Sequence, residues 1–230
     1  MNATLTASDS LNIDAIRREL ASETFACHVY LFGEVSSTNE VLRAVASEGA
    51  REGTVVIAEA QRAGRGRLGK PWFSPPGVNL YLSILLRPRV APQAAPIFAQ
   101  IAAVALTEAI AIEGAAATLR GPNDVLVDGR KVAGILLDCA TRDGAVEQAI
   151  VGVGVNLNVT REALARGLGA EGTRATSLRE AAGREIDRNR FVAAFLNLFE
   201  KWLAVYRVRG AEGVRAAWRE HAVSSATTLD

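Results

Sequence analysis

Two Asp-Gly dipeptides restrict the fold more than any other feature of the sequence. Asp128-Gly129 and Asp143-Gly144 each join two apolar runs, and Asp-Gly is a pair that the type I′ turn of a β-hairpin prefers. Strands joined by such tight turns are antiparallel. The sheet is therefore expected to be mixed or antiparallel, and not a succession of βαβ units.

Helical periodicity predicts helices around this sheet. Apolar residues recur at helical spacing from Phe191 to Trp202, which predicts one long helix between Asp187 and about Gly210. Ser37-x-x-Glu40 has the form of a capping box, so a second helix should begin there. Further helices are expected over 12–20, 97–113 and 214–221, and strands over 29–32, 54–60 and 78–88. The predicted fold class is α+β, with residues 1–230 forming one domain.

Composition excludes several classes of protein. A chain of 230 residues with 49% hydrophobic content can build one full core. Its formal net charge of +1, from 26 basic and 25 acidic residues, gives no electrostatic footprint for nucleic acid or an anionic membrane. The most apolar run, 97–112, is interrupted by polar residues and fits a buried helix better than a membrane span. No signal peptide is recognisable, so we expect a soluble cytoplasmic protein.

The few cysteines and histidines give no metal-ligand pattern. Cys27 and Cys139 are far apart in the sequence, and His28 and His221 are the only histidines. We therefore expect reduced thiols and no fixed metal site in the protein.

A glycine-rich loop follows the strand predicted at 54–60. Gly64, Gly66 and Gly69 spell G-x-G-x-x-G, the pattern of a dinucleotide cradle. That cradle needs a helix directly after its glycines, and Pro71, with two more prolines at 75 and 76, forbids a regular helix there. The dinucleotide interpretation therefore fails on context.

The basic residues of this loop suggest another ligand. Arg62, Arg65, Arg67 and Lys70 alternate with glycine and lead into Trp72-Phe73. Arginine pairs with carboxylate or phosphate in a planar, bidentate way, and glycine lets the backbone approach a ligand closely. A solvated flexible loop is the alternative. The loop stands after a buried strand and before two aromatic residues. This position favours the interpretation that the loop is a mobile lid, which covers an anionic ligand with a flat ring.

Three short stretches add polar candidates. Lys131 is one of only three lysines in a chain that otherwise uses arginine, and its neighbours are apolar. It is either an exposed hairpin charge or a group that meets a ligand. Asn123-Asp124 is either a turn entry or part of a site at the mouth of a strand. Ser37 is already explained as a helix cap, whereas Thr38 and Asn39 could also face a ligand.

Taken together, five stretches resemble the biotin protein ligases in order and spacing. They are "STN" (37–39), "EAQRAGRGRLGKPWFSPPGVNLYLS" (59–83), "PNDVLV" (122–127), "KVAGIL" (131–136) and "GVGVNLN" (152–158). The resemblance covers about 30–207. It implies an α+β catalytic domain akin to class II aminoacyl-tRNA synthetases and lipoate ligases.

The resemblance implies a two-step reaction with ATP, Mg²⁺ and biotin. The biotin carboxylate attacks the α-phosphate of ATP to give biotinyl-5′-adenylate and pyrophosphate, and a lysine of a biotin carrier domain then attacks the mixed anhydride. The biotin carboxylate and the phosphates of ATP are both negative, and like charges about 4 Å apart repel by roughly 4 kcal/mol at an effective dielectric near 20. Cations must offset this repulsion, and a lid must keep water from the adenylate.

The resemblance also assigns roles to residues of this chain. Lys131 would be the main electrostatic catalyst, and Arg65 and Arg67 would close over the carboxylate and the α-phosphate. The biotin site would comprise Ser37, Thr38, Gln61, Gly64, Arg65, Trp72, Lys131 and Gly134. The ATP and adenylate site would comprise Arg67, Trp72, Arg120, Asn123, Asp124 and Asn156, with Asp124 positioning metal or the incoming amine.

The chain departs from the family pattern at two places. The family reads K-W-P-N-D where this chain has Arg120-Gly121 before Pro122. If the tryptophan ring is a buried wall, its loss costs about 3–5 kcal/mol unless another group refills the space. No strand pattern follows Val223, so we expect no C-terminal SH3-like barrel. Only residues 1–29 precede the catalytic segment, which argues against a helix-turn-helix and a DNA-binding repressor role.

Two other functions stay open at this point. One is a related acyl ligase acting on lipoate or octanoate, and the other is a non-catalytic protein that binds biotin or its adenylate. The "GRGRLG" loop with Gln61 resembles the biotin branch. The expected partners are the carrier domain and the small-molecule substrates, without nucleic acid or membrane. Family members often dimerise through the sheet, so a homodimer is a further expectation.

Overall fold

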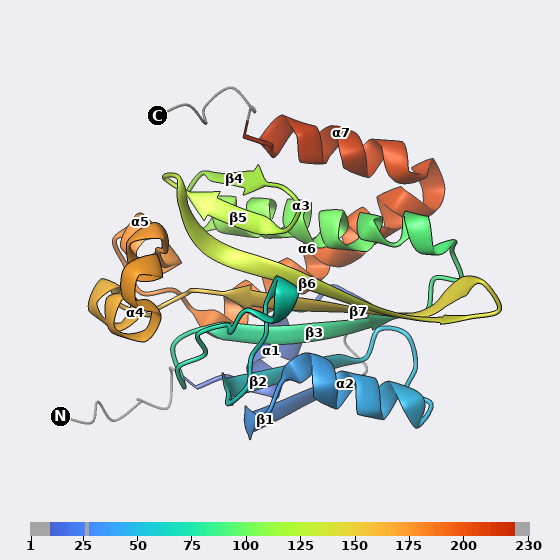
Figure 1. Ribbon diagram of the computed structural model, residues 1–230, viewed down its shortest axis with the longest axis horizontal. Helices are drawn as coiled ribbons and strands as arrows, with labels where there is room; N and C mark the ends of the chain where they lie inside the picture. Colours follow the sequence, from blue (N-terminus) through green and yellow to red (C-terminus); the bar gives the residue numbers. More distant parts are fainter. Residues whose placement is uncertain (1–9, 26–27, 224–230) are drawn as a thin grey trace.

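A seven-stranded mixed sheet forms the centre of the molecule. The computed structural model describes residues 10–25 and 28–223. The strand order is β1-β2-β3-β7-β6-β5-β4 (Figure 1). β1 and β2 are parallel, and all other neighbouring strands are antiparallel. The strands are β1 (Val29–Val35), β2 (Val55–Gln61), β3 (Leu80–Leu86), β4 (Ala117–Arg120), β5 (Asp124–Val127), β6 (Arg130–Arg142) and β7 (Ala145–Val155). The predicted α+β class with a mixed sheet is confirmed.

Helices flank the sheet as predicted, with additional short ones at one end. The helices are α1 (Ile13–Glu19), α2 (Thr38–Ser47), α3 (Pro96–Ile112), α4 (Arg161–Leu168), α5 (Leu178–Ala182), α6 (Arg188–Arg209) and α7 (Ala211–His221). Three short 3₁₀ turns are η1 (Arg67–Gly69), η2 (Pro92–Ala94) and η3 (Gly169–Arg174). β4, α4, η3 and α5 had not been predicted, because these short segments carry little periodicity.

Both predicted hairpin turns form. Asp128 and Gly129 have φ angles of 50° and 71°, and Asp143 and Gly144 have 51° and 77°. Positive φ at both central residues is the signature of a type I′ turn, whose twist matches that of the strands it joins. These turns bring β5, β6 and β7 side by side, so residues far apart in the chain meet on one face of the sheet.

The two faces of the sheet are covered unequally. Side chains alternate between the faces along each strand. Val151, Val153 and Val155 of β7 join the large core beneath α3 and α6, whereas Ile150 packs with Leu42 of α2 in a smaller cluster. In Figure 1, α2 lies over the β1–β3 end of the sheet, and α4 and α5 lie beyond one end of its strands. α2 therefore covers only part of its face of the sheet.

α3 is the core helix that the apolar run predicts. The segment Pro92–Ile112 is long and apolar enough to cross a membrane, but 67% of its most apolar window is buried inside the structure. It packs against the sheet, α6 and α7. These contacts account for its apolar composition without a membrane.

The predicted capping box has the right position, but its predicted hydrogen bonds do not form. Ser37 does occupy the N-cap position of α2, but its side chain makes no capping hydrogen bond. The Glu40 carboxylate instead accepts a bond of 2.8 Å from Ser36 Oγ and pairs with Arg65 at 3.1 Å. The pull of this arginine explains why Glu40 does not reach back to the helix start. Cys27 lies outside the described residues, and the Cys139 thiol is free and exposed.

Candidate active site

One cavity on the α2 face of the sheet collects almost all of the predicted site residues. Its volume is about 400 Å³, and it lies between α2, the loop at 62–73, β6, β7 and the α4–η3 segment. Of the predicted residues it is lined by Ser37, Thr38, Gln61, Arg65, Arg67, Trp72, Arg120, Asn123, Asp124, Lys131, Gly134 and Asn156. Gly64 is the exception. A Cβ there would lie 2.7 Å from Ser74 Oγ and 2.9 Å from Gln61 Nε2, so Gly64 packs behind Gln61 and not on the cavity.

Two glycines form the floor of the cavity beneath Trp72. Gly134 of β6 and Gly154 of β7 are directly opposite each other in the sheet. A Cβ at Gly134 would lie 3.0 Å from the indole, and one at Gly154 would lie 2.5 Å from it. A Cβ does not fit at 2.5 Å, and at 3.0 Å it would require the indole to shift, so the ring lies this close to the sheet because both positions lack side chains. Trp72 therefore lines the cavity, and its predicted contact with biotin or adenine stays a prediction.

A second glycine of β7 makes room for α2. Gly152 stands two residues before Gly154 and therefore on the same face of the strand. A Cβ at Gly152 would collide with the side-chain amide of Asn39. Asn39 is 5% exposed, so the close packing of α2 against β7 depends on this glycine. Gly152 and Gly154, at alternate positions of β7, are the sequence signal for this side of the cavity. Of Gly134, Gly152 and Gly154, only Gly134 is among the predicted site residues.

Hydrogen bonds fix the polar end of the cavity, between α2 and β2. The Gln61 carbonyl Oε1 accepts from the backbone N–H of Thr38 at 2.9 Å and from the Thr38 hydroxyl at 3.2 Å. Gln61 Nε2 donates to Ser74 Oγ at 3.2 Å, and this hydroxyl donates to the Trp72 carbonyl at 2.9 Å. Gln61 therefore links the start of α2 to the end of the loop.

The same network continues behind the cavity wall. Ser83 Oγ lies 2.8 Å from Thr38 Oγ1 and 2.6 Å from Asn39 Oδ1, and Ser83 is completely buried. Asn39 Nδ2 donates to Asp138 at 2.9 Å, and Arg43 holds the same carboxylate oxygen at 2.8 Å. Since buried polar groups are costly to leave unpaired, these contacts hold Thr38 and Asn39 in one orientation.

The opposite end of the cavity is built from ion pairs. Asp124 accepts from Lys131 Nζ at 2.6 Å and from Arg120 at 2.9 Å. Burial raises the pKa of Asp124, but the hydrogen bonds and charges of Lys131 and Arg120 outweigh this effect and hold the pKa below its usual range. Asp124 is therefore ionised at neutral pH. Lys131 Nζ also lies 5.3 Å from the centre of the Trp72 ring, a cation–π distance.

The two predicted asparagines use their amide groups to join backbone segments. Asn123 Nδ2 donates to the Ile135 carbonyl at 2.9 Å. Asn156 Nδ2 donates to the Thr176 carbonyl at 3.0 Å and is buried. Both residues line the cavity, but the bonds of these donors are structural. The interpretation of Asn123 as a turn residue and its interpretation as a site residue are thus compatible.

The loop at 62–73, which we call the lid, is anchored at its base and carries charge at its tip. The Trp72 N–H donates to the Gly64 carbonyl at 2.8 Å, and the Gly66 N–H donates to the Lys70 carbonyl at 2.7 Å. Leu68 at the tip has a φ angle of 57° and is 91% exposed. Since a side chain at positive φ is unfavourable, the tip is strained in this conformation.

The lid touches the α4–η3 segment across the cavity mouth. Lys70 Nζ lies 3.9 Å from Glu171 of η3, and the Phe73 ring packs where a side chain on Gly167 would stand. The segment after the "GVGVNLN" stretch therefore forms the other wall of the site. Sequence reasoning missed this wall because nothing in residues 161–175 predicted an element there.

A ring from α7 lies beside Gly121. A Cβ at Gly121 would be 3.6 Å from Cη2 of Trp218, and Trp218 belongs to the layer packed around the large core. Trp218 thus supplies an indole at the turn where the K-W-P-N-D pattern would place one. Trp218 belongs to a distant part of the chain, so sequence spacing could not reveal that it packs beside Gly121.

The cavity carries a strong positive excess. Six basic residues and two acidic ones line it, which leaves a formal excess of four positive charges in a chain whose net charge is +1. Within the described residues, no group of three or more His, Cys, Asp and Glu side chains is placed to hold a metal ion. The charge pattern fits a ligand with several negative charges.

Comparisons with known proteins agree with this geometry. The model of the biotin/lipoate A/B protein ligase family matches residues 31–156, more than half of the chain. The chain belongs to this family. It is 33% identical over 220 residues to the bifunctional ligase/repressor BirA of Bacillus subtilis, covering 95% of this chain and 67% of that protein. It is 38% identical over 166 residues to the biotin–[acetyl-CoA-carboxylase] ligase of Paracoccus denitrificans, covering 71% and 68%.

Solved structures extend the likeness to three dimensions. The biotin protein ligase of Aquifex aeolicus, in complex with biotin and ATP, superposes with a TM-score of 0.71 at 27% identity, covering 86% of this chain and 79% of that one. This family member therefore has the biotin protein ligase fold, as the sequence resemblance implied.

Proposed function

We propose that the protein is an ATP-dependent biotin–protein ligase. The observation that carries the proposal is the single cavity that joins a neutral hydrogen-bonding end to a cationic end. Biotin has a neutral ureido ring and a carboxylate, and ATP carries the polyphosphate, so their charges match this arrangement. The relatives named as biotin ligases and the Aquifex aeolicus structure with biotin and ATP support it. The catalytic core would cover about 30–207.

In the first step, a carboxylate oxygen of biotin attacks the α-phosphorus of ATP. The bond from the α-phosphorus to the bridging oxygen breaks, and pyrophosphate leaves with the electron pair. Ser37, Thr38 and Gln61 hold the ureido ring in this proposal. Lys131 leaves Asp124 and stabilises the negative charge that develops on the α-phosphate. Mg²⁺ would neutralise part of the charge on the phosphates, and Asp124 is the residue of this chain that would hold it.

In the second step, the neutral amine of an acceptor lysine attacks the carbonyl carbon of biotinyl-adenylate. An amide forms, AMP leaves, and the proton of the amine passes to water or to Asp124. The anhydride must not meet water before the acceptor arrives. Arg67 on the lid retains the adenylate, and the acceptor is a lysine of a biotin carrier domain such as that of a carboxylase.

Biotin-dependent exchange between ATP and labelled pyrophosphate tests the first step. We expect exchange with biotin, none without it, and biotin transfer to a carrier domain in the presence of Mg²⁺. Exchange with lipoate or octanoate in place of biotin would assign the protein to the other branch of the family. Binding of biotin without any exchange would show a non-catalytic protein and sink the ligase proposal.

A further inference from the structure

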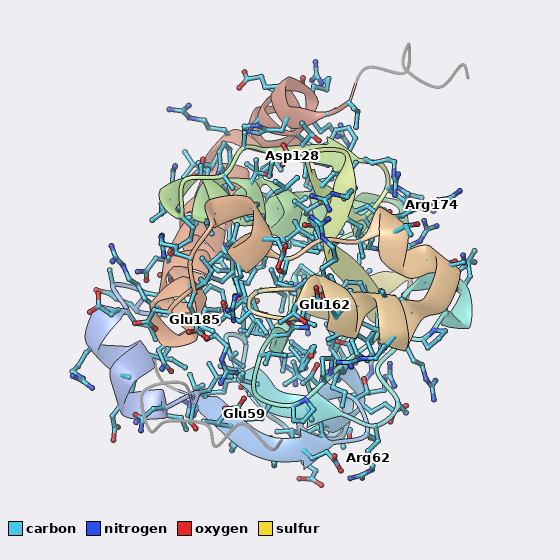
Figure 2. All side chains as sticks on the ribbon, turned by 90° about the vertical axis from the view of Figure 1, so that its left-hand side faces the viewer. Glu59, Arg62, Asp128, Glu162, Arg174 and Glu185 are labelled. Carbon is cyan, nitrogen blue, oxygen red and sulfur yellow. The ribbon has the colours of Figure 1, made fainter. Side chains whose placement is uncertain are left out.

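Arg174, the last residue of η3, lines the cavity and has no role in the steps above. In Figure 2 it lies at the edge of the α4–η3 segment on the side of the β5–β6 hairpin, whose turn is marked by Asp128. Arg62, where the lid begins, is on the opposite side, near β2. Arg174 therefore lies away from the polar end of the cavity that Thr38 and Gln61 form.

Backbone contacts fix the position of Arg174. The next residue, Ala175, forms a parallel bridge with Lys131, and the N–H of Thr176 donates to the Lys131 carbonyl at 2.9 Å. On the other side, Gly172 is buried against the backbone of Leu164 and Ala165 in α4, so close that a Cβ would not fit. The guanidinium group thus starts from a backbone tied to the strand of Lys131.

The charge of Arg174 lacks an acidic partner in the described part of the chain. The structure pairs Arg65 with Glu40, Lys70 with Glu171, and both Arg120 and Lys131 with Asp124. Of the six cations that line the cavity, only Arg67 and Arg174 have no carboxylate within 4.0 Å among residues 10–25 and 28–223. An unpaired arginine in a cavity is suited to an anion brought by the ligand.

We propose that Arg174 binds the β- and γ-phosphates of ATP, the part that leaves as pyrophosphate. The inference rests on the proposed function. If biotin enters at Thr38 and Gln61 and its carboxylate meets the α-phosphate at Lys131, the remaining phosphates extend toward the side of η3. A guanidinium group offers them two parallel hydrogen bonds. By holding the leaving group it accelerates adenylate formation, whereas the transfer step gains nothing from it.

The test compares Arg174→Gln with Arg166→Gln. Arg166 lies on α4 in the same segment and outside the cavity, so its variant controls for the loss of one charge. We expect Arg174→Gln to slow adenylate formation in a single turnover and to raise the inhibition constant of pyrophosphate, each by about tenfold. Transfer from pre-formed biotinyl-adenylate should keep the parent rate, and Arg174→Lys should recover part of the loss.

Calorimetry separates this proposal from the ligase proposal. In the presence of biotin, Arg174→Gln should bind α,β-methylene-ATP about tenfold more weakly than the parent and should bind AMP equally well. This comparison stands even if the parent forms no adenylate, an outcome that would count against the ligase function alone. Equal weakening toward AMP would mean contact with the nucleoside, and unchanged binding of both nucleotides would mean no contact. Either result overturns the assignment of Arg174.

Discussion

At one end of the cavity, Thr38, Asn39 and Ser83 are no more than 5% exposed and are joined by hydrogen bonds. At the other end, Lys131 and Arg120 keep 31% and 55% of their side-chain surface and share one carboxylate. Breaking the buried network leaves unpaired polar groups, at about 1–3 kcal/mol each. Breaking a half-exposed ion pair costs about 0–1 kcal/mol.

The difference matches what the proposed function requires of each end. A neutral ring is recognised by donors and acceptors that already point the right way, so a fixed network serves it. Phosphates and an acceptor amine arrive and leave in each cycle, so the cations need partners that they can give up. In the proposed mechanism, Asp124 would hold Lys131 and Arg120 in place until a phosphate group displaces it. We therefore expect variants at the two ends to fail in different ways.

Lys131→Ala gives the largest expected effect. Removal of one group that stabilises charge in the transition state costs about 100- to 1,000-fold in rate, so adenylate formation should fall by that factor. Biotin binding should change far less, because the contacts to the ureido ring remain. Single-turnover kinetics and calorimetry measure the two quantities. Lys201→Ala, on α6 and outside the cavity, is the matched control. Near-parent rates in Lys131→Ala would remove this residue from its role.

Arg67→Gly should fail in retention of the intermediate. Arg67 is exposed on the lid, so the fold should tolerate the change. We expect biotinyl-adenylate to leave the variant about 10- to 100-fold faster, as a charged hydrogen bond is worth about 1.5–3 kcal/mol. Released adenylate would label lysines of an added bystander protein, which mass spectrometry detects. A variant that keeps its adenylate as long as the parent would contradict the role of the lid.

Gln61→Leu should damage the polar end alone. It removes the acceptor of two bonds from Thr38 and one donor to Ser74. We expect the KM for biotin to rise about tenfold while the KM for ATP stays within twofold. Gln148→Leu on β7 makes the same change outside the cavity. If both Michaelis constants rise together in Gln61→Leu, the two ends are coupled and the comparison above breaks down.

Trp218→Ala should have the smallest effect on activity. Loss of this half-buried ring should lower the free energy of unfolding by about 1–3 kcal/mol and raise the KM for ATP a few-fold, by loosening the turn that carries Asp124. Adding Gly121→Trp should recover part of the lost free energy of unfolding and lower the KM for ATP again, because the new ring would enter the vacated space. Denaturant unfolding of the two single variants and the double variant gives the interaction free energy between positions 121 and 218. Simple additivity would show that the two positions do not share this space.

The sequence predicts the parts of the molecule in which local chemistry decides the structure. The Asp-Gly turns, the long α6 and the buried strands follow from turn preference and periodicity, and the motif residues follow from the family resemblance. Twelve of the thirteen predicted site residues line one cavity, and only Gly64 does not. Their individual roles in binding and catalysis stay predictions.

The remaining features depend on contacts between distant segments. Glu40 leaves its helix cap because Arg65, from the lid, is close enough to pair with it. Trp218 meets Gly121 only because α7 packs back on β4. The α4–η3 wall and Arg174 join the site through a bridge to Lys131. None of these partners is near in sequence, so no local pattern could predict them.

The glycine floor under Trp72 limits how this cavity can be redesigned. Gly134 and Gly154 have no side chain to shorten, so no substitution there can deepen the cavity, and any larger residue would push the indole outward. If biotin binds against Trp72 as proposed, a smaller residue at Trp72 is the change that would make room for an enlarged analogue at this place. The same substitution would take away the ring beneath Lys131. An engineered change of ligand size at this place is thus tied to a change in the surroundings of the lysine.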